Sequence, residues 1–366
     1  MRNEDVNALL LFNRITNYTP RQKFVLLERY KTAGSIFLSR KKAEDVLKKP
    51  FKINGKPLNI NQEQESIKKE LLYYRKNNIA VIDINSRYYP VQLKYIYDPP
   101  PVIFAQGKVE LLQKECPVGI IGARKASNSS ITLGYGVAKE LSKVNAVIVS
   151  GLACGIDFYA HKGVLDGNGF TIAVLGNGID IIYPRENVGM YNRIKNKGLL
   201  ITEFPLGTPP FKYNFPKRNR IISGLSMGIV VVEAAANSGA LITAMYALDQ
   251  GREVMAFPGR AASESFGGNN RLIKEGAHLV ESASDILSIL GKDFEYKQEG
   301  SKLSYSLLEQ DIINVIGDDK VSIEEIERFL NSPISKIASA LIMLELKCAV
   351  VQHPGKIFSK VYKYGK

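Results

Sequence analysis

Short runs of Val, Ile, Leu and Ala recur between residue 117 and about residue 290, and each run is long enough for a single buried strand. Segments of roughly 10 to 15 residues with helical spacing separate most of these runs. Continuous apolar runs that alternate with helices are typical of a parallel sheet covered on both faces. The pattern therefore predicts a doubly wound α/β core. The expected strands are 118–121, 146–149, 171–175, 199–202, 229–232 and 253–256.

The segment before this core has a different pattern. Residues 1–75 contain apolar clusters separated by polar and basic residues, which predicts a small helical domain. Residues 76–116 are transitional and contain two further expected strands, 79–83 and 102–105. The core is therefore expected to cover residues 76–290.

The chain continues beyond the core into a small unit. Residues 291–303 are polar and without periodicity, so they are expected to be a linker to a domain at 304–366. Three helical patterns and then a hairpin signal follow, which is the order of a winged helix. Few polar side chains lie on the outer face of its third helix, so protein binding and weak DNA binding both remain open. The expected helices are 307–316, 322–330 and 333–346, and the hairpin strands are 349–351 and 357–358.

A cluster of cations lies in the segment F-P-K-R-N-R-I-I-S-G-L-S at 215–226. Lys217, Arg218 and Arg220 surround Asn219 there, and no Asp or Glu occurs between residues 204 and 232. Because an expected strand follows directly, the segment is predicted to be a cationic turn on the rim of the sheet. The net charge of +13 also indicates a polyanionic partner, with a merely solvated basic surface as the alternative.

Glycine-rich turns follow the expected strands at the edge where open parallel sheets bind ligands. Gly122 and Arg124 follow the first strand, 150–157 follows the second, and 176–180 and Arg185 follow the third. Glycines allow a ligand to approach the backbone, and helix N-termini offer free N–H donors to phosphate oxygens. Each turn alone could be a tight connection. Their convergence with cations on one edge predicts a phosphate-binding rim.

Motifs of several enzyme classes are missing or misplaced. No G-x-G-x-x-G follows the first strand, and no G-x-x-x-x-G-K-[ST] occurs, which disfavours a dinucleotide fold and an ATP-driven motor. Residues 224–228 match G-x-S-x-G, but a strand follows them instead of a helix, so Ser226 is expected to be structural. Asp157 and His161 share a helical spacing. A packing pair is favoured over an acid–base pair because no third partner is evident.

The cysteines and histidines are too scattered to indicate a disulfide framework or a zinc site. No signal-peptide pattern occurs at the N-terminus, and no run reaches the ~18 apolar residues of a membrane span. The chain is therefore expected to be cytoplasmic, with no metal, no other cofactor and no membrane partner.

Many of these segments closely resemble, in order and spacing, the DNA-processing protein A family, also called DprA or Smf. The similarity covers roughly residues 80–290. Its segments are G-A-R at 122–124, S-G-L-A-C-G-I-D at 150–157, A-H-K-G at 160–163, L-G-N-G-I-D-I-I-Y-P at 175–184, F-P-K-R-N-R-I-I-S-G-L-S at 215–226, V-V-E-A-A-A-N-S-G-A-L-I-T-A at 231–244, G-R-E-V-M-A-F-P-G at 251–259 and G-G-N-N-R-L-I-K-E-G-A at 267–277.

The resemblance implies an extended Rossmann-like core that binds single-stranded DNA without sequence preference. A sterile-alpha-motif-like N-terminal domain and a C-terminal winged helix would flank it. It also implies a non-enzymatic homodimer that protects incoming strands and loads the recombinase RecA during natural transformation or recombination. Ala123 stands where the family usually has Ser. The implied DNA-binding residues are Gly122, Arg124, Arg185, Lys217, Arg218, Asn219 and Arg220.

Two alternatives from other functional classes remain open. A nucleotide-binding or nucleotide-hydrolysing enzyme related to phosphoribohydrolases could use the same rim, although residues 233–243 lack the P-G-G-x-G-T of that group. A transcriptional regulator that works through the winged helix is the other alternative.

Overall fold

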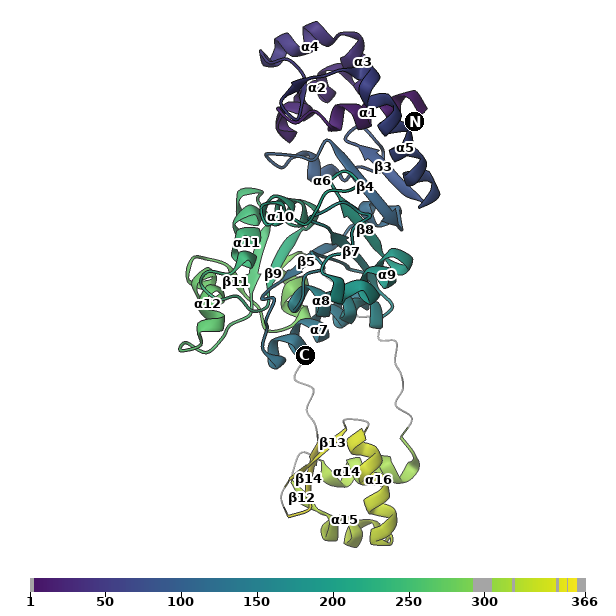
Figure 1. Cartoon of the computed structure of the whole chain (residues 1–366). Helices are drawn as coiled ribbons and strands as arrows, with labels where there is room; N and C mark the ends of the chain where they lie inside the picture. The colour runs from purple at the N-terminus through teal and green to yellow at the C-terminus, as the bar shows by residue number, and fades with distance from the viewer. Residues whose placement is uncertain (1–2, 292–304, 318–319, 347–348, 354, 361–366) are drawn as a thin grey trace. The chain divides into compact units, whose positions relative to one another are not determined.

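The computed structural model describes residues 3–291, 305–317, 320–346, 349–353 and 355–360. The chain forms two compact units, Met1–Tyr296 and Lys297–Lys366 (Figure 1). Most of the predicted linker lies outside the described residues. Within the described ranges, no helix has both the length and the apolar character needed to cross a membrane.

Helices begin the first unit, as the sequence pattern predicts. A capping box fixes the start of the second helix, because the Thr19 side chain accepts from the Gln22 N–H and the Gln22 side chain accepts from the Thr19 N–H. A two-stranded hairpin, β1 (Lys52–Ile53) and β2 (Lys56–Pro57), was not predicted. Its turn is Asn54-Gly55, which is a strong hairpin signal. The helices are α1 (Asn3–Asn13), α2 (Pro20–Tyr30), α3 (Ala33–Leu38), α4 (Arg40–Leu47) and α5 (Ile60–Lys76).

A nine-stranded sheet forms the centre of this unit, with strand order β11-β10-β9-β5-β6-β7-β8-β4-β3. Neighbouring strands from β11 to β8 are parallel, and β4 runs antiparallel to both β8 and β3. The predicted mainly parallel, doubly wound sheet is confirmed. The strands are β3 (Ile79–Asp83), β4 (Val102–Gly107), β5 (Pro117–Ile121), β6 (Val147–Ser150), β7 (Phe170–Val174), β8 (Leu199–Thr202), β9 (Gly228–Val231), β10 (Glu253–Ala256) and β11 (His278–Leu279).

The strand order reverses between β5 and β9. From β5 the chain adds β6, β7 and β8 on one side, and it then returns to add β9, β10 and β11 on the other. The last residues of the two strands, Ile121 and Val231, are paired in register. Ligands of open α/β sheets bind outside the carboxyl ends of the strands near such a reversal.

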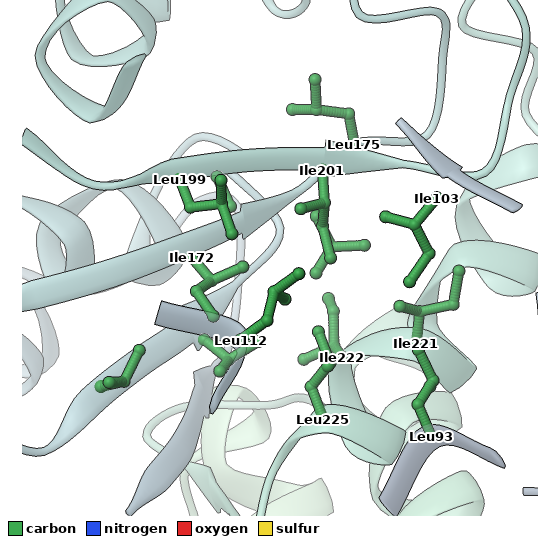
Figure 2. Packing of buried hydrophobic residues seen from close by; sticks show 14 of the residues in the cluster. Leu93, Ile103, Leu112, Ile172, Leu175, Leu199, Ile201, Ile221, Ile222 and Leu225 are labelled. Carbon is green, nitrogen blue, oxygen red and sulfur yellow. The ribbon is translucent and has the colours of Figure 1, made fainter. Parts of the chain in front are cut away.

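Helices and short 3₁₀ segments connect these strands. Figure 2 shows Ile221, Ile222 and Leu225 of α10 in one apolar cluster with Ile103 of β4 and Ile201 of β8. This packing fixes one face of α10 against the sheet. The connecting helices are α6 (Val91–Lys94), α7 (Asn128–Ser142), α8 (Ile156–Asp166), α9 (Val188–Lys197), α10 (Asn214–Leu225), α11 (Gly239–Asp249) and α12 (Gly267–Lys274), and the 3₁₀ segments are η1 (Val109–Gln113), η2 (Arg185–Asn187) and η3 (Glu264–Phe266). One more helix, α13 (Ala283–Ile289), follows the last strand.

The predicted cationic turn is wrong, because residues 215–220 lie inside α10. Pro216 is the third residue of that helix, where a missing N–H breaks no intrahelical hydrogen bond. The apolar residues that follow it, including Ile221 and Leu225, then bury the helix against the sheet. The cations are consequently distributed around a helix, and some of them point inward.

The second unit has the predicted winged-helix order. Its sheet has the order β12-β14-β13, and the short β12 was not predicted. Ile312, Ile337, Leu341 and Phe358 lie in its separate apolar core. The elements are α14 (Leu307–Ile316), β12 (Val321–Ser322), α15 (Ile323–Leu330), α16 (Ile334–Leu346), β13 (Val350–His353) and β14 (Ile357–Lys360).

Candidate functional site

A small pocket of about 60 Å³ opens beyond the carboxyl ends of β5, β6 and β7. It lies at the edge of the sheet where the sequence predicts a phosphate-binding rim. None of its described lining residues is acidic. The pocket is lined by Arg124, Gly151, Leu152, Ala153, Cys154, Leu175, Gly176, Asn177, Tyr183, Pro184, Phe215 and Arg218.

Aromatic rings and guanidinium groups meet at the pocket. The Arg124 guanidinium lies 5.5 Å from the centre of the Phe215 ring, and that of Arg218 lies 5.8 Å from the same ring. Tyr183 packs against Phe215 with a centroid separation of 5.5 Å. Arg124 itself is exposed. The pocket therefore presents a free cation beside an aromatic surface, a combination that suits a phosphate with an attached planar base.

Arg218 lies on the inner side of the pocket and is only 4% exposed. Its Nη1 donates to the Gly151 carbonyl oxygen at 2.8 Å and also to that of Val174. Burial, partly offset by Asp157, lowers the pKa of Arg218 to about 10, so it remains charged at neutral pH. A ligand in the pocket would therefore meet the edge of a fixed positive charge.

Arg220 points away from the pocket into an internal ion pair. Its two terminal nitrogens donate to the Glu203 carboxylate at 2.9 and 2.7 Å, and its Nε lies 3.7 Å from an oxygen of Asp98. The side chain is 7% exposed. The cation-only stretch seen in the sequence thus acquires its counter-charges from residues that are distant along the chain. This geometry gives Arg220 a structural role.

The glycines of the rim make room for the protein's own side chains. A Cβ atom at Gly176 would lie 2.8 Å from the Phe215 ring, and one at Gly122 would lie 2.6 Å from the Ile156 side chain. At Gly151 a Cβ would lie 2.5 Å from the Arg218 guanidinium. From the sequence, these glycines are predicted to be points of ligand approach. Here they allow α10 and α8 to pack closely over the strand ends.

The N-terminus of α7 is occupied from within the chain. Ser127 caps the helix, and its N–H and hydroxyl donate to the Glu233 carboxylate at 3.0 and 2.6 Å. Glu233 is buried and follows β9. An anion that binds at the rim would meet this carboxylate at the α7 terminus, so the cations and not this helix end are available for phosphate.

The remaining predicted site residues lie outside the pocket lining. Lys217 is exposed, with its Nζ 5.3 Å from the centre of the Tyr213 ring. Arg185 is exposed and begins η2 directly after the lining residue Pro184. The Asn219 side chain accepts from the Arg218 Nε at 3.1 Å. Whether these residues bind a ligand stays a prediction.

Three candidate catalytic side chains each have at least one structural partner. The Asp157 carboxylate accepts from the Gly151 N–H, and Ser226 donates to the Ile222 carbonyl oxygen. His161 is fully buried and its Nδ1 lies 2.7 Å from the Thr171 hydroxyl. Thr171 donates to the Ile148 carbonyl, so its oxygen accepts from His161. The favoured interpretation as packing residues agrees with this geometry.

Some stacking by Phe or Tyr near the rim is expected from the sequence, but no individual aromatic residue was singled out. Phe211 and Tyr213 are exposed and stacked, with ring centroids 5.3 Å apart. Together with Tyr183 and Phe215 they alternate with cations in the segments around Arg185 and Lys217. That interleaving of aromatic and basic residues was the available signal.

Both units of the chain match a known protein family. Residues 80–291 match the family described as DNA recombination-mediator protein A, and residues 299–356 match the DprA winged helix domain. The DNA processing protein DprA of Bacillus subtilis is 40% identical over 266 residues, which is 73% of this chain and 90% of that protein.

Two solved structures are similar over almost their whole length. DNA processing protein A from Streptococcus pneumoniae has 32% identity and a TM-score of 0.64, over 77% of this chain and 97% of that one. The protein from Helicobacter pylori, whose structure concerns its single-stranded DNA binding mode, has 30% identity and a TM-score of 0.54. That match covers 59% of this chain and 97% of the other.

Proposed function

Because the chain belongs to the DNA recombination-mediator protein A family, we propose that it binds single-stranded DNA without sequence preference at the pocket rim. The Helicobacter pylori relative has a described mode of binding single-stranded DNA, which supports this function. Arg124 and Lys217 would contact phosphates, and Tyr183 and Phe215 would offer ring surface to bases. We include Arg185 as a third exposed phosphate contact.

One observation carries this proposal: an exposed guanidinium, Arg124, lies over the Phe215 ring at a pocket whose described lining residues include no acid. Phosphate recognition supplies affinity without sequence information, and aromatic stacking tolerates every base. Gly122 would contribute by keeping the backbone before Arg124 close to α8. Arg218 would add a fixed positive charge beneath the bound DNA, and Asn219 would hold the Arg218 guanidinium in place.

The test is the affinity of an Arg124→Ala variant for single-stranded oligonucleotides across a salt series. Loss of one charged phosphate contact should weaken binding roughly tenfold for every sequence. The slope of log affinity against log salt should fall in magnitude by about one. Binding to a duplex of equal length, measured in parallel, separates preference for unpaired DNA from general attraction.

Lys139→Ala is the matched control, because Lys139 is an exposed cation near the end of α7, the end away from the rim. Its removal changes net charge equally and should leave the salt slope unchanged. Equal slopes for the wild type, Arg124→Ala and Lys139→Ala would remove Arg124 from the interface.

We further propose that the protein delivers the bound strand to the recombinase RecA, acts as a homodimer, and works in the cytoplasm during transformation or recombination. The family description as a recombination mediator supports the first point. The test is the lag before RecA assembles on DNA already covered by a single-strand-binding protein. The chain should shorten that lag, and Arg124→Ala should restore it. Sedimentation of the full chain tests the dimer.

We propose no enzymatic activity. The pocket volume of about 60 Å³ is well below the ~300 Å³ of ordinary small-molecule sites. The candidate acid and base, Asp157 and His161, are buried and are not pocket-lining residues. Release of a free base from nucleoside monophosphates would contradict this proposal.

A further inference from the structure

A second basic and aromatic surface lies away from the pocket, between α2 and the segment around α6. A groove of about 510 Å³ runs between them. Its lining combines three cations and two aromatic rings with one carboxylate. These residues are Arg21, Lys31, Lys94, Phe24, Tyr95 and Glu28.

Hydrogen bonds at both ends of α2 fix the walls of this groove. The Arg21 N–H donates to the Asp98 carboxylate at 2.7 Å, at the beginning of the helix. At its other end, the Asn85 side chain donates to the Lys31 carbonyl oxygen at 2.7 Å. The groove is therefore a built feature of the first unit, and its cations project from backbone that is held in place.

Two tyrosines extend this surface into solvent. Tyr95 is 82% exposed and Tyr97 is 87% exposed. Ile96, between them, is buried, and a Cβ added at Gly224 of α10 would lie 2.9 Å from its side chain. The buried isoleucine thus anchors a short segment that presents two aromatic rings outward. Exposed rings beside cations are stacking platforms for unpaired bases.

A chain of contacts connects this surface to the pocket rim. The carbonyl oxygen of the exposed Lys217 accepts from Arg220 at 3.2 Å, Arg220 lies 3.7 Å from Asp98, and Asp98 binds the Arg21 N–H. Arg218, one residue after Lys217, lines the pocket. The two surfaces therefore lie on either side of one buried ion-pair cluster.

We propose that Tyr95, Tyr97 and the groove cations form a second contact surface for an unpaired polynucleotide that is already held at the pocket rim. The inference rests on the proposed function and extends it to longer strands. The positive excess of the groove matches a phosphate backbone. The Glu28 carboxylate would lie beside the bound polynucleotide and would weaken its binding to the groove.

The test uses the full chain carrying Tyr95→Ala with Tyr97→Ala, and oligothymidylates of increasing length. Short strands that fill only the pocket rim should bind as they do to the wild type. Long strands should bind at least about fivefold more weakly, since each lost stacking contact reduces affinity by that factor or more. Tyr95→Phe with Tyr97→Phe keeps both rings and should restore binding at every length.

A second measurement locates the contact directly. Long strands that contain 5-bromodeoxyuridine should photocrosslink to the peptide that carries Tyr95 and Tyr97. Crosslinks confined to the pocket rim would overturn the inference. The alanine substitutions are at exposed positions, so the variant should retain its unfolding midpoint, and this is measured first.

The outcomes separate this inference from the function on which it rests. The double alanine variant could bind strands of every length as tightly as the wild type while Arg124→Ala binds them more weakly. That result would refute the second surface and would still support binding at the pocket rim. If the wild type binds no oligothymidylate, both fail. Altered self-association or altered capture of a protein partner, with DNA affinity unchanged, assigns the tyrosines to a protein contact and also overturns the inference.

Discussion

The cations of the candidate site, Arg124 from residues 122–124 and three more from residues 215–226, occupy two opposite environments. Arg124 and Lys217 are exposed and lie beside aromatic rings. Arg218 and Arg220 are buried, one against backbone carbonyl oxygens and the other against Glu203. An exposed cation can exchange water for a phosphate at little cost, whereas a buried one already has its partners.

This contrast teaches that a count of positive residues in a motif overstates the binding surface. The outer pair should govern affinity for an anion and contribute little to stability. The inner pair should govern stability, because removing one member of a buried pair leaves an uncompensated charge. Substitutions at and around the buried arginines test this distinction between binding and stability, and the pH dependence of stability tests it further.

The largest effect is expected from Arg220→Met. The substitution leaves the Glu203 carboxylate, 12% exposed at its side chain, without its bidentate partner. The free energy of unfolding should fall by about 3–5 kcal/mol, as for other broken buried ion pairs. Urea denaturation of the wild type and variant measures the difference.

The control is the double substitution Arg220→Met with Glu203→Gln. It removes both charges of the bidentate pair and should recover most of the lost stability, because the largely buried Glu203 position then carries no charge. If Arg220→Met were as stable as the wild type but bound DNA poorly, Arg220 would act like the exposed cations. That result would contradict the distinction between binding cations and stabilising cations.

An intermediate effect is expected from Gly151→Ala. The added Cβ would lie 2.5–2.6 Å from three atoms of the Arg218 guanidinium and would displace it from its carbonyl partners. The expected cost is about 1–3 kcal/mol of stability, as for overpacked cores. Gly136→Ala is the matched control, because no atom lies within 4 Å of its Cβ position in α7. That change should stabilise the helix by about 0.5–1 kcal/mol. Equal midpoints for the two variants in thermal unfolding would contradict the tight contact.

The smallest effect concerns His161 and acid. Burial, with the nearby charge of Arg218 as a second cause, lowers the pKa of His161 to about 3. The unfolded chain therefore binds a proton at His161 near pH 6.5, whereas the folded chain does not. The contribution of His161 to stability is fully present above pH 6.5 and is lost as the pH falls toward 3. From about pH 7.5 to 5.5 the loss should be roughly 1.4 kcal/mol.

Comparing the pH dependence of His161→Gln with that of the wild type isolates this contribution. The substitution changes stability at every pH, so the slopes and not the levels are compared. The variant should show the shallower decline in denaturant midpoint between neutral and mildly acidic pH. Parallel curves for the two proteins would mean that His161 titrates alike in both states.

Much of the fold is predictable because apolar spacing reports burial directly. The strand 199–202 and the helix 307–316 have the expected bounds, since each is a continuous or periodic apolar pattern. The helical state of 215–220 was missed because Pro216 and the adjacent charges resemble a turn. Only its packing against β5, β6 and β7, through residues distant in sequence, makes the helix evident.

The position of the candidate site was predictable. Which of its residues are exposed for binding and which are buried for stability was not. Arg124 comes shortly after β5, and Arg218 lies near the start of the helix that comes after β8. The carboxyl ends of these parallel strands lie at one edge of the sheet, so both residues are expected there. The sequence could not show that Glu203 and Asp98 reach Arg220, because these pairs are made by tertiary packing. The glycines were ambiguous for the same reason, since a Cβ-free position serves a ligand and a neighbouring side chain equally well.

The helical state of residues 214–225 makes the length of this motif as important as its composition. One extra residue between Lys217 and Arg218 would rotate everything after it by about 100° around the helix axis. The inward guanidiniums would then face a different neighbour, although no charge had been lost. Among relatives and engineered variants, this stretch should therefore tolerate exchanges of residue type more readily than insertions or deletions.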